Sequence, residues 1–245
     1  MLVTGASRGI GAAVAREFAA AGDRVAVHYV RSRAAAEGVA ESLPGGPHLV
    51  VGADLGDPAA VQAMVDEAAA GLDGLEVLVN NAAIYVEHDV VSSSYEEWCA
   101  DWEQTLRVDL LGTASVTWCA VRHMLVGGTG RIVNVSSSGA YRGERRAPAY
   151  GAAKGGLISF GNALARALAE HRIAVTTVVP SWTETDMAAD SLGGPRADAI
   201  RSESPFARVA TPVDVAKAVL YLASPEAEFA SGTTLHVNGA SYLTL

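Results

Sequence analysis

Cysteine, positive charge and long hydrophobic runs are all scarce in this sequence of 245 residues. The two cysteines, Cys99 and Cys119, are far apart, so we expect no disulfide framework and no metal site, and we predict two buried thiols. The net charge of −9 argues against nucleic acid or an anionic membrane surface as a partner. No stretch approaches the roughly 18 apolar residues of a membrane span, and the stub Met1–Val3 runs directly into a glycine turn, which leaves no room for a signal peptide. We therefore predict a cytoplasmic protein.

What the sequence does contain is a tyrosine and a lysine one helical turn apart, Tyr150 and Lys154 in A-Y-G-A-A-K-G-G. Residues four apart share a helix face, so the ammonium can lie beside the phenol. A tyrosine titrates near ~10, and activity near neutral pH requires roughly 3–4 kcal/mol of extra phenolate stabilisation. A cation ~5 Å away at an effective dielectric constant of ~20 contributes about 3 kcal/mol. The pair predicts an acid–base catalyst, although helices also produce such pairs by chance.

The N-terminus reads as strand, glycine turn and helix. The apolar stub Met1–Val3 precedes T-G-A-S-R-G-I-G, which contains Gly5, Gly9 and Gly11, and an apolar-periodic stretch follows over Ala12–Ala21. Glycines let the backbone approach a pyrophosphate, whose charge is met by the amides at a helix N-terminus. The spacing is G-x-x-x-G-x-G rather than the G-x-G-x-x-G of the general dinucleotide motif. The motif predicts a dinucleotide site, the alternative being a glycine-rich helix entry that binds nothing.

Strand and helix signals alternate along the chain, as a doubly wound parallel sheet requires. A chain of this length builds one core, so we predict a single α/β domain over residues 1–245. The first strand is three or four residues short, which would weaken a central strand or place the true start upstream. The predicted strands are Met1–Val3, Arg24–Val30, His48–Val51, Val77–Asn80, Arg131–Val135, Val175–Val179 and Thr234–Val237.

Local signals also place several helices. Gly22 is expected to end the first helix, and Asp57, followed by proline, is expected to cap another. A long helix is predicted from Tyr95 to about Arg122, with Trp98 and Trp102 on one face. We expect this pair to pack in the core or between subunits rather than to bind a ligand.

Seven ordered motifs extend over essentially the whole chain. They are T-G-A-S-R-G-I-G (Thr4–Gly11), A-D-L (Ala53–Leu55), N-N-A-A (Asn80–Ala83), R-I-V-N-V-S-S-S (Arg131–Ser138), Y-G-A-A-K (Tyr150–Lys154), P-S-W-T-E-T-D-M (Pro180–Met187) and S-G-T-T-L-H-V-N-G (Ser231–Gly239). Together they resemble the short-chain dehydrogenase/reductases. The branch most similar in look is the 3-oxoacyl-carrier-protein reductases, partly through Ser204–Ala216.

This resemblance implies a Rossmann-like doubly wound sheet flanked by helices, and an oxidoreductase that interconverts a ketone and a secondary alcohol. It implies a homotetramer, or a dimer, built on the helices Tyr95–Arg122 and Ala149–His171 and on the segment Leu235–Leu245. The family pattern places a serine 13 positions before the tyrosine, which is Ser137, with Ser136 and Ser138 as competing assignments. Ser137 would bind the substrate oxygen, while the tyrosine of Y-x-x-x-K would move a proton and its lysine would hold the nicotinamide ribose.

One residue departs from the family pattern at the catalytic site. Where the family has an asparagine, in a segment similar to V-N-L-x-G-T, this chain has Asp109 in V-D-L-L-G-T. An ionised Asp109 near Lys154 would raise the pKa of Tyr150, opposing its activation by a similar ~3 kcal/mol. Activity would survive if the residue acts through its backbone carbonyl and a water, as the family residue largely does, or if a desolvated Asp109 is protonated.

Charge after the second predicted strand indicates which nicotinamide cofactor binds. An acid about 20 residues past the glycine loop holds a ribose without the 2′-phosphate, and the corresponding position here is approximately Tyr29. Arg8, Arg31 and Ser32 would instead meet a 2′-phosphate, which favours NADP(H) over NAD(H), unless both arginines are only solvated surface residues. By resemblance, Asp54 contacts the adenine. The full set of expected cofactor-binding residues is Gly5, Ser7, Arg8, Gly9, Ile10, Gly11, Arg31, Ser32, Asp54, Leu55, Asn80 (linking the central strand to the cofactor ribose), Ala82, Tyr150, Lys154, Pro180, Thr183 and Thr185.

The substrate is only broadly indicated. In reductases of carrier-bound acyl chains, basic residues flank the site entrance near Gly128 and His171, neither of which is cationic here, although Arg172 adjoins one. A carrier protein is therefore not a supported partner, and we expect a small or polyketide-like metabolite. The loop at about 187–206 is expected to form a substrate lid. Two other functions stay open, a weakly active cofactor-binding regulator and an epimerase or dehydratase on the same site.

Overall fold

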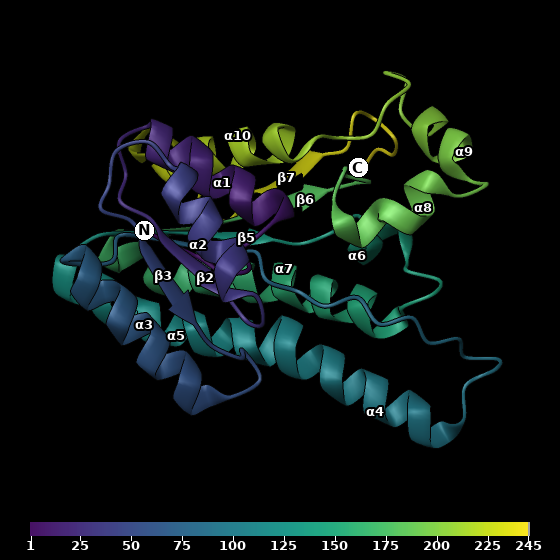
Figure 1. The fold of residues 1–245 in the computed structure, drawn as a ribbon, viewed down its shortest axis with the longest axis horizontal. Coiled ribbons are helices and arrows are strands. Elements are labelled where there is room, and N and C mark those ends of the chain that lie inside the picture. The colour runs from purple at the N-terminus through teal and green to yellow at the C-terminus, as the bar shows by residue number, and fades with distance from the viewer. Residues whose placement is uncertain (245) are drawn as a thin grey trace.

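The computed structural model describes residues 1–244 and has one seven-stranded sheet, all of whose strand pairs are parallel. The order of the strands is β3-β2-β1-β4-β5-β6-β7, with the first strand in the interior of the sheet (Figure 1). The strands are β1 Leu2–Val3, β2 Ala26–Tyr29, β3 Leu49–Gly52, β4 Val77–Asn80, β5 Gly130–Val135, β6 Ile173–Pro180 and β7 Thr234–Val237. The predicted doubly wound α/β fold in a single domain is confirmed.

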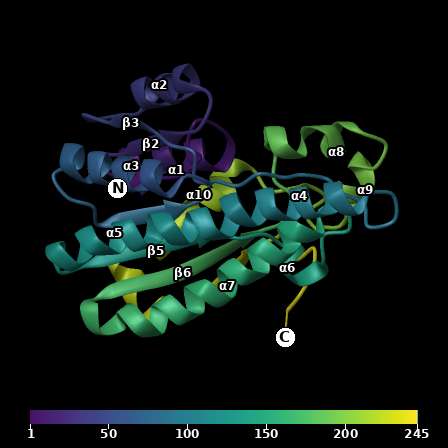
Figure 2. The ribbon, with the colours of Figure 1, turned by 90° about the horizontal axis from the view of Figure 1, so that it is seen from below.

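Helices cover both faces of the sheet (Figures 1 and 2). One face carries α1 (Gly9–Ala20), α2 (Arg33–Ser42) and α10 (Pro212–Leu222), and the opposite face carries α3 (Pro58–Leu72), α5 (Thr113–Gly127) and α7 (Pro148–Leu168). Each face has its own cluster of buried aliphatic side chains, so the sheet separates two hydrophobic layers. This is the arrangement that a parallel sheet with crossover helices requires.

The predicted helix boundaries follow local chemistry. Asp57 caps α3 by accepting hydrogen bonds from the amides of Ala59 and Ala60, and Pro58 occupies the first turn. Gly22, just past the end of α1, has a φ of +101°, a left-handed conformation that glycine adopts without strain. Both expectations from the sequence are confirmed.

The long helix predicted from Tyr95 is not α-helical along its whole length. It begins as α4 (Tyr95–Leu106), passes through the π-helical segment η1 (Arg107–Gly112) and continues as α5 to Gly127, five residues beyond the expected end. A π-helical turn inserts an extra residue and rotates the side chains that follow, and such turns are frequent at functional sites. The sequence carries no local sign of this change.

The two tryptophans of α4 pack as expected on one face. The ring centroids of Trp98 and Trp102 lie 5.7 Å apart, and both rings contact the buried His88. The prediction of two buried thiols is right for Cys119 but wrong for Cys99, because α4 is amphipathic and Cys99 lies on its exposed side.

Two short helices stand on the segment between β6 and α10, at the carboxyl end of the sheet (Figure 1). They are α8 (Ala189–Gly193) and α9 (Ala197–Ser202), preceded by the 3₁₀ turn η3 (Asp186–Ala188). The remaining elements are α6 (Gly139–Arg142) and the 3₁₀ turns η2 (Ala169–His171) and η4 (Pro225–Ala230). Within residues 1–244, none of the helices has the length and apolar character to span a bilayer.

Candidate active site

The glycine turn between β1 and α1 has a shape that only glycine allows. Gly5 and Gly9 have φ angles of +63° and +56°, in the left-handed region that other residues avoid. A Cβ on Gly11 would lie 2.4 Å from the carbonyl oxygen of Gly5, so a side chain there has no room. The side chain of Arg8, at the N-cap, forms no hydrogen bond with the first turn of α1. The first helical amides are therefore available to an anion, which fits the pyrophosphate of a nicotinamide cofactor.

A buried histidine that sequence reasoning missed holds this turn in place. The Nδ1 atom of His28, on β2, accepts a hydrogen bond of 2.9 Å from the amide of Gly5. Its Nε2 atom lies 3.0 Å from the carbonyl oxygen of Ala53, which makes Nε2 the protonated nitrogen of a neutral ring. Burial lowers the pKa of His28 and keeps the ring neutral. In the sequence, His28 reads only as one more residue of an apolar strand.

Two side chains on neighbouring strands complete the support. The hydroxyl oxygen of Thr4 accepts hydrogen bonds from the amides of Asn81 and Ala82. The side-chain amide of Asn81 donates to the carbonyls of Thr4 and Gly5. The turn is thus held from β1, β2 and the end of β4 together.

The side chain of Asn80 lies in the interior of the protein. Its side chain is buried, and its Nδ2 atom donates to the hydroxyl of Thr117 and to the side-chain oxygen of Asn134. The amide therefore joins β4 to β5 and α5 inside the protein, and it is the next residue, Asn81, that contacts the glycine turn. The Oδ1 atom of Asn80 has no partner among residues 1–244, and its link to a cofactor ribose stays a prediction.

The polar residues expected around the adenosine end lie on exposed loops at the carboxyl ends of β1, β2 and β3. Arg31 is exposed, Ser32 caps α2, and the carboxylate of Asp54 accepts a hydrogen bond from the amide of Gly56. Arg8 pairs with Asp186 of η3 at 3.3 Å, and both side chains are largely exposed. The ion pair links the glycine turn to the segment that carries α8 and α9, but an exposed pair of this kind contributes little to stability.

The remaining expected cofactor residues divide by burial. Leu55, Pro180 and Thr183 are buried, and Ser7, Ile10, Ala82 and Thr185 are half-buried. The methyl group of Thr185 lies 3.4 Å from the place that a Cβ on Gly9 would take. The segment after β6 therefore closes directly over the glycine turn.

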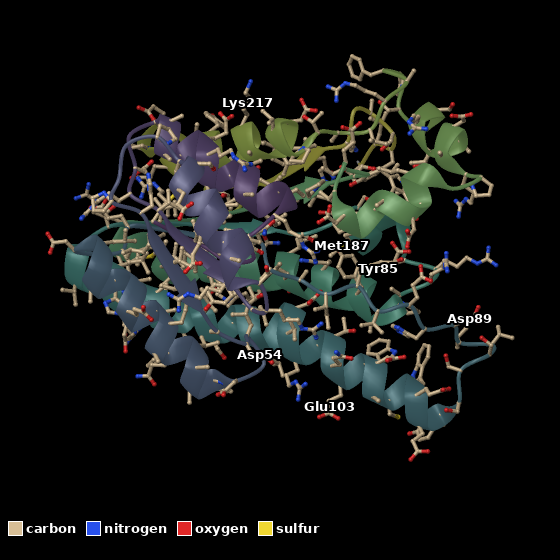
Figure 3. All side chains as sticks on the ribbon, in the orientation of Figure 1. Asp54, Tyr85, Asp89, Glu103, Met187 and Lys217 are labelled. Atoms are coloured by element: carbon tan, nitrogen blue, oxygen red, sulfur yellow. The ribbon has the colours of Figure 1, made fainter. Side chains whose placement is uncertain are left out.

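Tyr150 and Lys154 are both buried near the start of α7, with 9% and 2% of their surface exposed. The Nζ atom of Lys154 donates to the carbonyl of Val135 at 3.0 Å and lies 5.5 Å from the centroid of the Tyr150 ring. The chain has two lysines, and the other, Lys217, points outward from α10 (Figure 3). The structure thus brings the predicted tyrosine–lysine pair together in the interior.

The three candidate serines have different surroundings. Ser136 donates its hydroxyl to the carbonyl of Lys154, which fixes α7 to β5. The backbone amide of Ser138 donates a hydrogen bond to the carbonyl of Pro180, and Ser138 directly precedes α6. Ser137 accepts from the amide of Gly139, and its hydrogen bond with Tyr150 lowers the pKa of that phenol. The geometry favours Ser137 over its two neighbours.

Asp109 lies in the π-helical segment η1, close enough to Lys154 for their charges to interact. It is fully buried; its Oδ1 atom accepts the amide of Ile84 at 2.9 Å, and its Oδ2 atom has no partner among residues 1–244. Burial raises the pKa of Asp109 to about 6, although the charge of Lys154 acts to lower it. The carboxyl is therefore mostly ionised at neutral pH.

The phenol of Tyr150 is not activated in the way that the spacing predicted. Burial raises the pKa of Tyr150, and the negative charge of Asp109 and, more weakly, that of Glu144 raise it further. Burial also lowers the pKa of Lys154, against the opposing effect of Asp109. We expected the lysine to lower the pKa of Tyr150, but burial and the nearby carboxylates move it upward.

The two positions considered for carrier docking lie far from this site within one chain. Gly128 precedes β5 and His171 precedes β6, at the amino ends of the strands, whereas Tyr150 is at the start of α7, over the carboxyl ends. At 1.5 Å per helical residue, α7 separates Tyr150 from His171 by about 30 Å. The expectation that these positions flank the site entrance is therefore wrong for a single chain.

A cavity of about 390 Å³ lies between the segment after β6 and the end of β7, and it is lined by Ser181, Trp182 and Phe206 among others. Its lining includes none of the three residues Ser137, Tyr150 and Lys154, so it lies beside the catalytic group rather than over it. Ser181 and Trp182 border this cavity on the side facing β7.

The chain is similar to known proteins in both sequence and structure. A family model described as "Enoyl-(Acyl carrier protein) reductase" matches residues 5–240. The chain is 34% identical to the 3-oxoacyl-[acyl-carrier-protein] reductase FabG of Staphylococcus aureus, covering 99% of this chain and 97% of that protein. It is 38% identical to nodulation protein G of a Rhizobium species, covering 97% and 94%. A dehydrogenase/reductase from Sinorhizobium meliloti superposes with a TM-score of 0.91 at 32% identity, covering 99% of this chain and 94% of that one.

Replacing Asp109 by asparagine should stabilise the protein at neutral and alkaline pH. The buried carboxyl has a pKa of about 6, against an ordinary value of 3.8, so between these values the folded state binds the proton more tightly than the unfolded state. The free energy of unfolding of the wild type therefore falls as the pH rises from about 4 to about 6, by at most about 3 kcal/mol at 1.36 kcal/mol per unit. The asparagine variant does not undergo this loss of stability. Its melting temperature should therefore be higher than that of wild type near pH 8 and similar to it near pH 4.

Thermal unfolding followed by circular dichroism across this pH range measures the effect. Asp190→Asn removes an equal charge from an exposed position on α8 and should show no such pH-dependent gain. Equal melting temperatures for Asp109→Asn and wild type near pH 8 would contradict an ionised, buried Asp109.

Proposed function

This chain belongs to the short-chain dehydrogenase/reductase family, and we propose that it is a ketoreductase that uses NADP(H) to interconvert a ketone and a secondary alcohol. The observation that carries the proposal is the surroundings of Tyr150. Ser137 is near enough to its phenol to lower the pKa of that group, and the buried ammonium of Lys154 lies against its ring. This group stands at the carboxyl edge of the sheet, as does the glycine turn, where the first amides of α1 would meet the pyrophosphate of a dinucleotide.

The protein's own residues would bind the carbonyl oxygen and deliver a proton to it. Bound NADPH would supply the hydride. The hydroxyl of Ser137 would hold the carbonyl oxygen, and Tyr150 would give its phenolic proton to that oxygen as negative charge develops there. Lys154 would stabilise the resulting phenolate and hold the ribose. Asp109, which faces Lys154, would set how much of that positive charge Tyr150 experiences.

The charges around Tyr150 favour reduction at neutral pH. A proton donor must carry its proton before the reaction, and burial together with Asp109 raises the pKa of Tyr150, which keeps the phenol protonated. Oxidation of an alcohol requires the phenolate as base, which the same environment disfavours. We therefore propose that ketone reduction is the direction for which this site is arranged.

The cofactor would lie along the groove from the glycine turn to Tyr150. At the adenosine end, three exposed residues would be within reach of a 2′-phosphate: Arg8, Arg31 and Ser32. The end of β2, where an acid would hold a ribose without that phosphate, is occupied by Tyr29. Asp54 would contact the adenine. The segment at about 187–206, with α8 and α9, would close over the substrate as a lid.

A carrier-bound substrate is not part of the proposal. The names of several relatives describe reductases of 3-oxoacyl groups on acyl carrier protein. In this chain Gly128 and His171 supply no fixed cation for an acidic carrier. We propose a free small ketone, or a polyketide-like one, as substrate.

Tyr150→Phe should abolish ketone reduction while leaving NADPH binding nearly unchanged, because the substitution removes only the transferable proton. Lys154→Ala should weaken both, since the ammonium would contact ribose and phenol alike. Binding is measured by fluorescence titration of NADPH, and turnover by its oxidation with a panel of ketones that includes an activated β-ketoester. Tyr221→Phe, at an exposed tyrosine of α10, is the control and should behave as wild type. Undiminished turnover in Tyr150→Phe would refute the assignment, and NADPH binding by wild type without any turnover would indicate a regulator.

NADPH should bind more tightly than NADH, and removal of the two arginines should narrow the difference. A charge-assisted hydrogen bond to phosphate contributes about 1.5–3 kcal/mol, so Arg31→Ala and Arg8→Ala should each weaken NADPH binding by roughly tenfold or more while NADH binding changes little. The control is Arg33→Ala, because Arg33 is equally exposed and is paired with Glu37. A wild-type protein that prefers NADH would show the charge argument to be wrong.

The protein should assemble as a homotetramer, or as a dimer, through the long helices. Leu111, Trp118 and Val126 leave a row of exposed apolar side chains along η1 and α5, the kind of surface that marks an interface. Trp118→Asp should shift the mass measured by light scattering toward the 25.2 kDa of one chain. Tyr221→Asp, on the opposite face of the sheet, should leave it unchanged. The expected interface also includes Leu235–Leu245, of which Leu245 lies outside the described residues. A wild-type monomer at micromolar concentration would disprove the assembly.

A further inference from the structure

A second tyrosine and a glutamate lie directly beside the catalytic group, and neither is among the residues assigned above to binding or catalysis. Tyr85 follows β4, and its ring meets the ring of Tyr150 edge to face, with centroids 5.3 Å apart. Its hydroxyl donates to the Oε1 atom of Glu144 at 3.1 Å. Figure 3 shows Tyr85 in the middle of the molecule, in the same region of the view as Met187 of the proposed lid. Tyr85 therefore holds the carboxylate of Glu144 next to the catalytic group.

Glu144 comes close to the serine that would hold the substrate oxygen. It lies in the loop between α6 and α7 and is half-buried. Its Oε2 atom is 3.4 Å, and the hydroxyl oxygen of Ser137 is 3.5 Å, from the point that a Cβ on Gly139 would take. The carboxylate oxygen and the serine hydroxyl are therefore at most about 7 Å apart. Its charge also reaches Tyr150, whose pKa it helps to raise.

One oxygen atom of the Glu144 carboxylate accepts no hydrogen bond from the part of the chain that the structure describes. Among residues 1–244, Oε1 receives the hydroxyl of Tyr85 and Oε2 receives no hydrogen bond. Within the described residues, none of the neighbouring cations Arg142, Arg145 and Arg146 forms an ion pair with Glu144, and Arg142 and Arg146 pair with Glu203 and Glu87 instead. Glu144 thus presents an unpaired anionic acceptor, and covering it with an apolar substrate group would remove its hydration without replacing the hydrogen bond.

We propose that the substrate carries a hydroxyl or ammonium group next to its reacting carbonyl, and that Oε2 of Glu144 receives this group while Ser137 holds the carbonyl oxygen. The inference rests on the proposed ketoreductase function and narrows its substrate class. Two hydrogen bonds and one α-substituent span the gap of up to about 7 Å between the two oxygens. Glu144 discriminates because an apolar substituent leaves its acceptor unsatisfied and a carboxylate is repelled by it.

Four methyl ketones of one skeleton, CH₃–CO–CH₂–X, test this preference directly. In hydroxyacetone, aminoacetone, butanone and acetoacetate, X is a hydroxyl, an ammonium, a methyl and a carboxylate group. With saturating NADPH near pH 7, wild type should reduce hydroxyacetone and aminoacetone with a kcat/KM roughly tenfold or more above that for butanone, since 1.4 kcal/mol corresponds to a factor of ten. Acetoacetate should be the poorest of the four.

Glu144→Gln separates charge from hydrogen bonding. The amide still accepts from a hydroxyl, so the variant should lose most of the preference for aminoacetone and keep part of that for hydroxyacetone, with acetoacetate improved. Its kcat/KM for butanone should rise, because the methyl substituent no longer covers a charged oxygen, and the retained turnover shows that the fold and the proton transfer are intact. Glu87→Gln removes the same charge from the exposed pair with Arg146 and should leave all four ratios unchanged.

Two results would overturn the inference alone. Equal kcat/KM for hydroxyacetone and butanone in wild type would show that Glu144 does not read the substituent, and a preference unaltered by Glu144→Gln would assign it to another residue. In both cases the reduction of butanone would leave the ketoreductase proposal standing. No reduction of any of the four ketones would refute both, because the proposed reaction would itself be absent.

Discussion

The buried ammonium of Lys154 is the constraint around which the site is organised. A cation with 2% of its surface exposed has lost most of its hydration, and such a loss is tolerated only where hydrogen bonds and an opposite charge replace the water. Here the carbonyl of Val135 accepts from Nζ and Asp109 supplies the negative charge. Asp109 can do so because the π-helical segment η1 aims it inward, and Ser136 fixes the backbone of Lys154 to β5.

The glycine turn depends on a second network of the same kind, built from neutral groups. His28, Thr4 and Asn81 come from β1, β2 and the end of β4, and all three bond to the backbone of the turn or its flanks. These contacts within the protein hold the left-handed glycines of the turn in place, so less ordering is required when a cofactor binds. Since His28 must stay neutral for Nδ1 to accept, acid would weaken this support before it affected the hydrophobic layers.

Much of the fold could be predicted from the sequence because strand and helix signals are local. All seven strands were predicted at nearly their observed positions, and so were the cap at Asp57 and the glycine after α1. The parts that were missed depend on contacts between distant segments. No pattern of neighbouring residues distinguishes the π-helical turn from an ordinary helix, and His28 looks like any buried strand residue until β1 and β3 are placed beside it. The role of Asn81 was missed because only the sheet register shows that its side chain, and not that of Asn80, contacts the glycine turn.

The spacing of Tyr150 and Lys154 correctly predicted their proximity, but it could not predict the sign of the effect on the phenol. A sequence shows which charges exist, whereas burial and the remaining charges determine the pKa, and here desolvation, Asp109 and Glu144 raise the pKa of Tyr150 against the lowering effect of Ser137. The two carboxylates differ in what else they can do. Asp109 is enclosed and acts only through its charge, on Lys154 and Tyr150, while Glu144 is half-buried, is held by Tyr85 and keeps one acceptor free. Both keep the phenol protonated for reduction, but only Glu144 is placed to recognise the ketone that receives the proton.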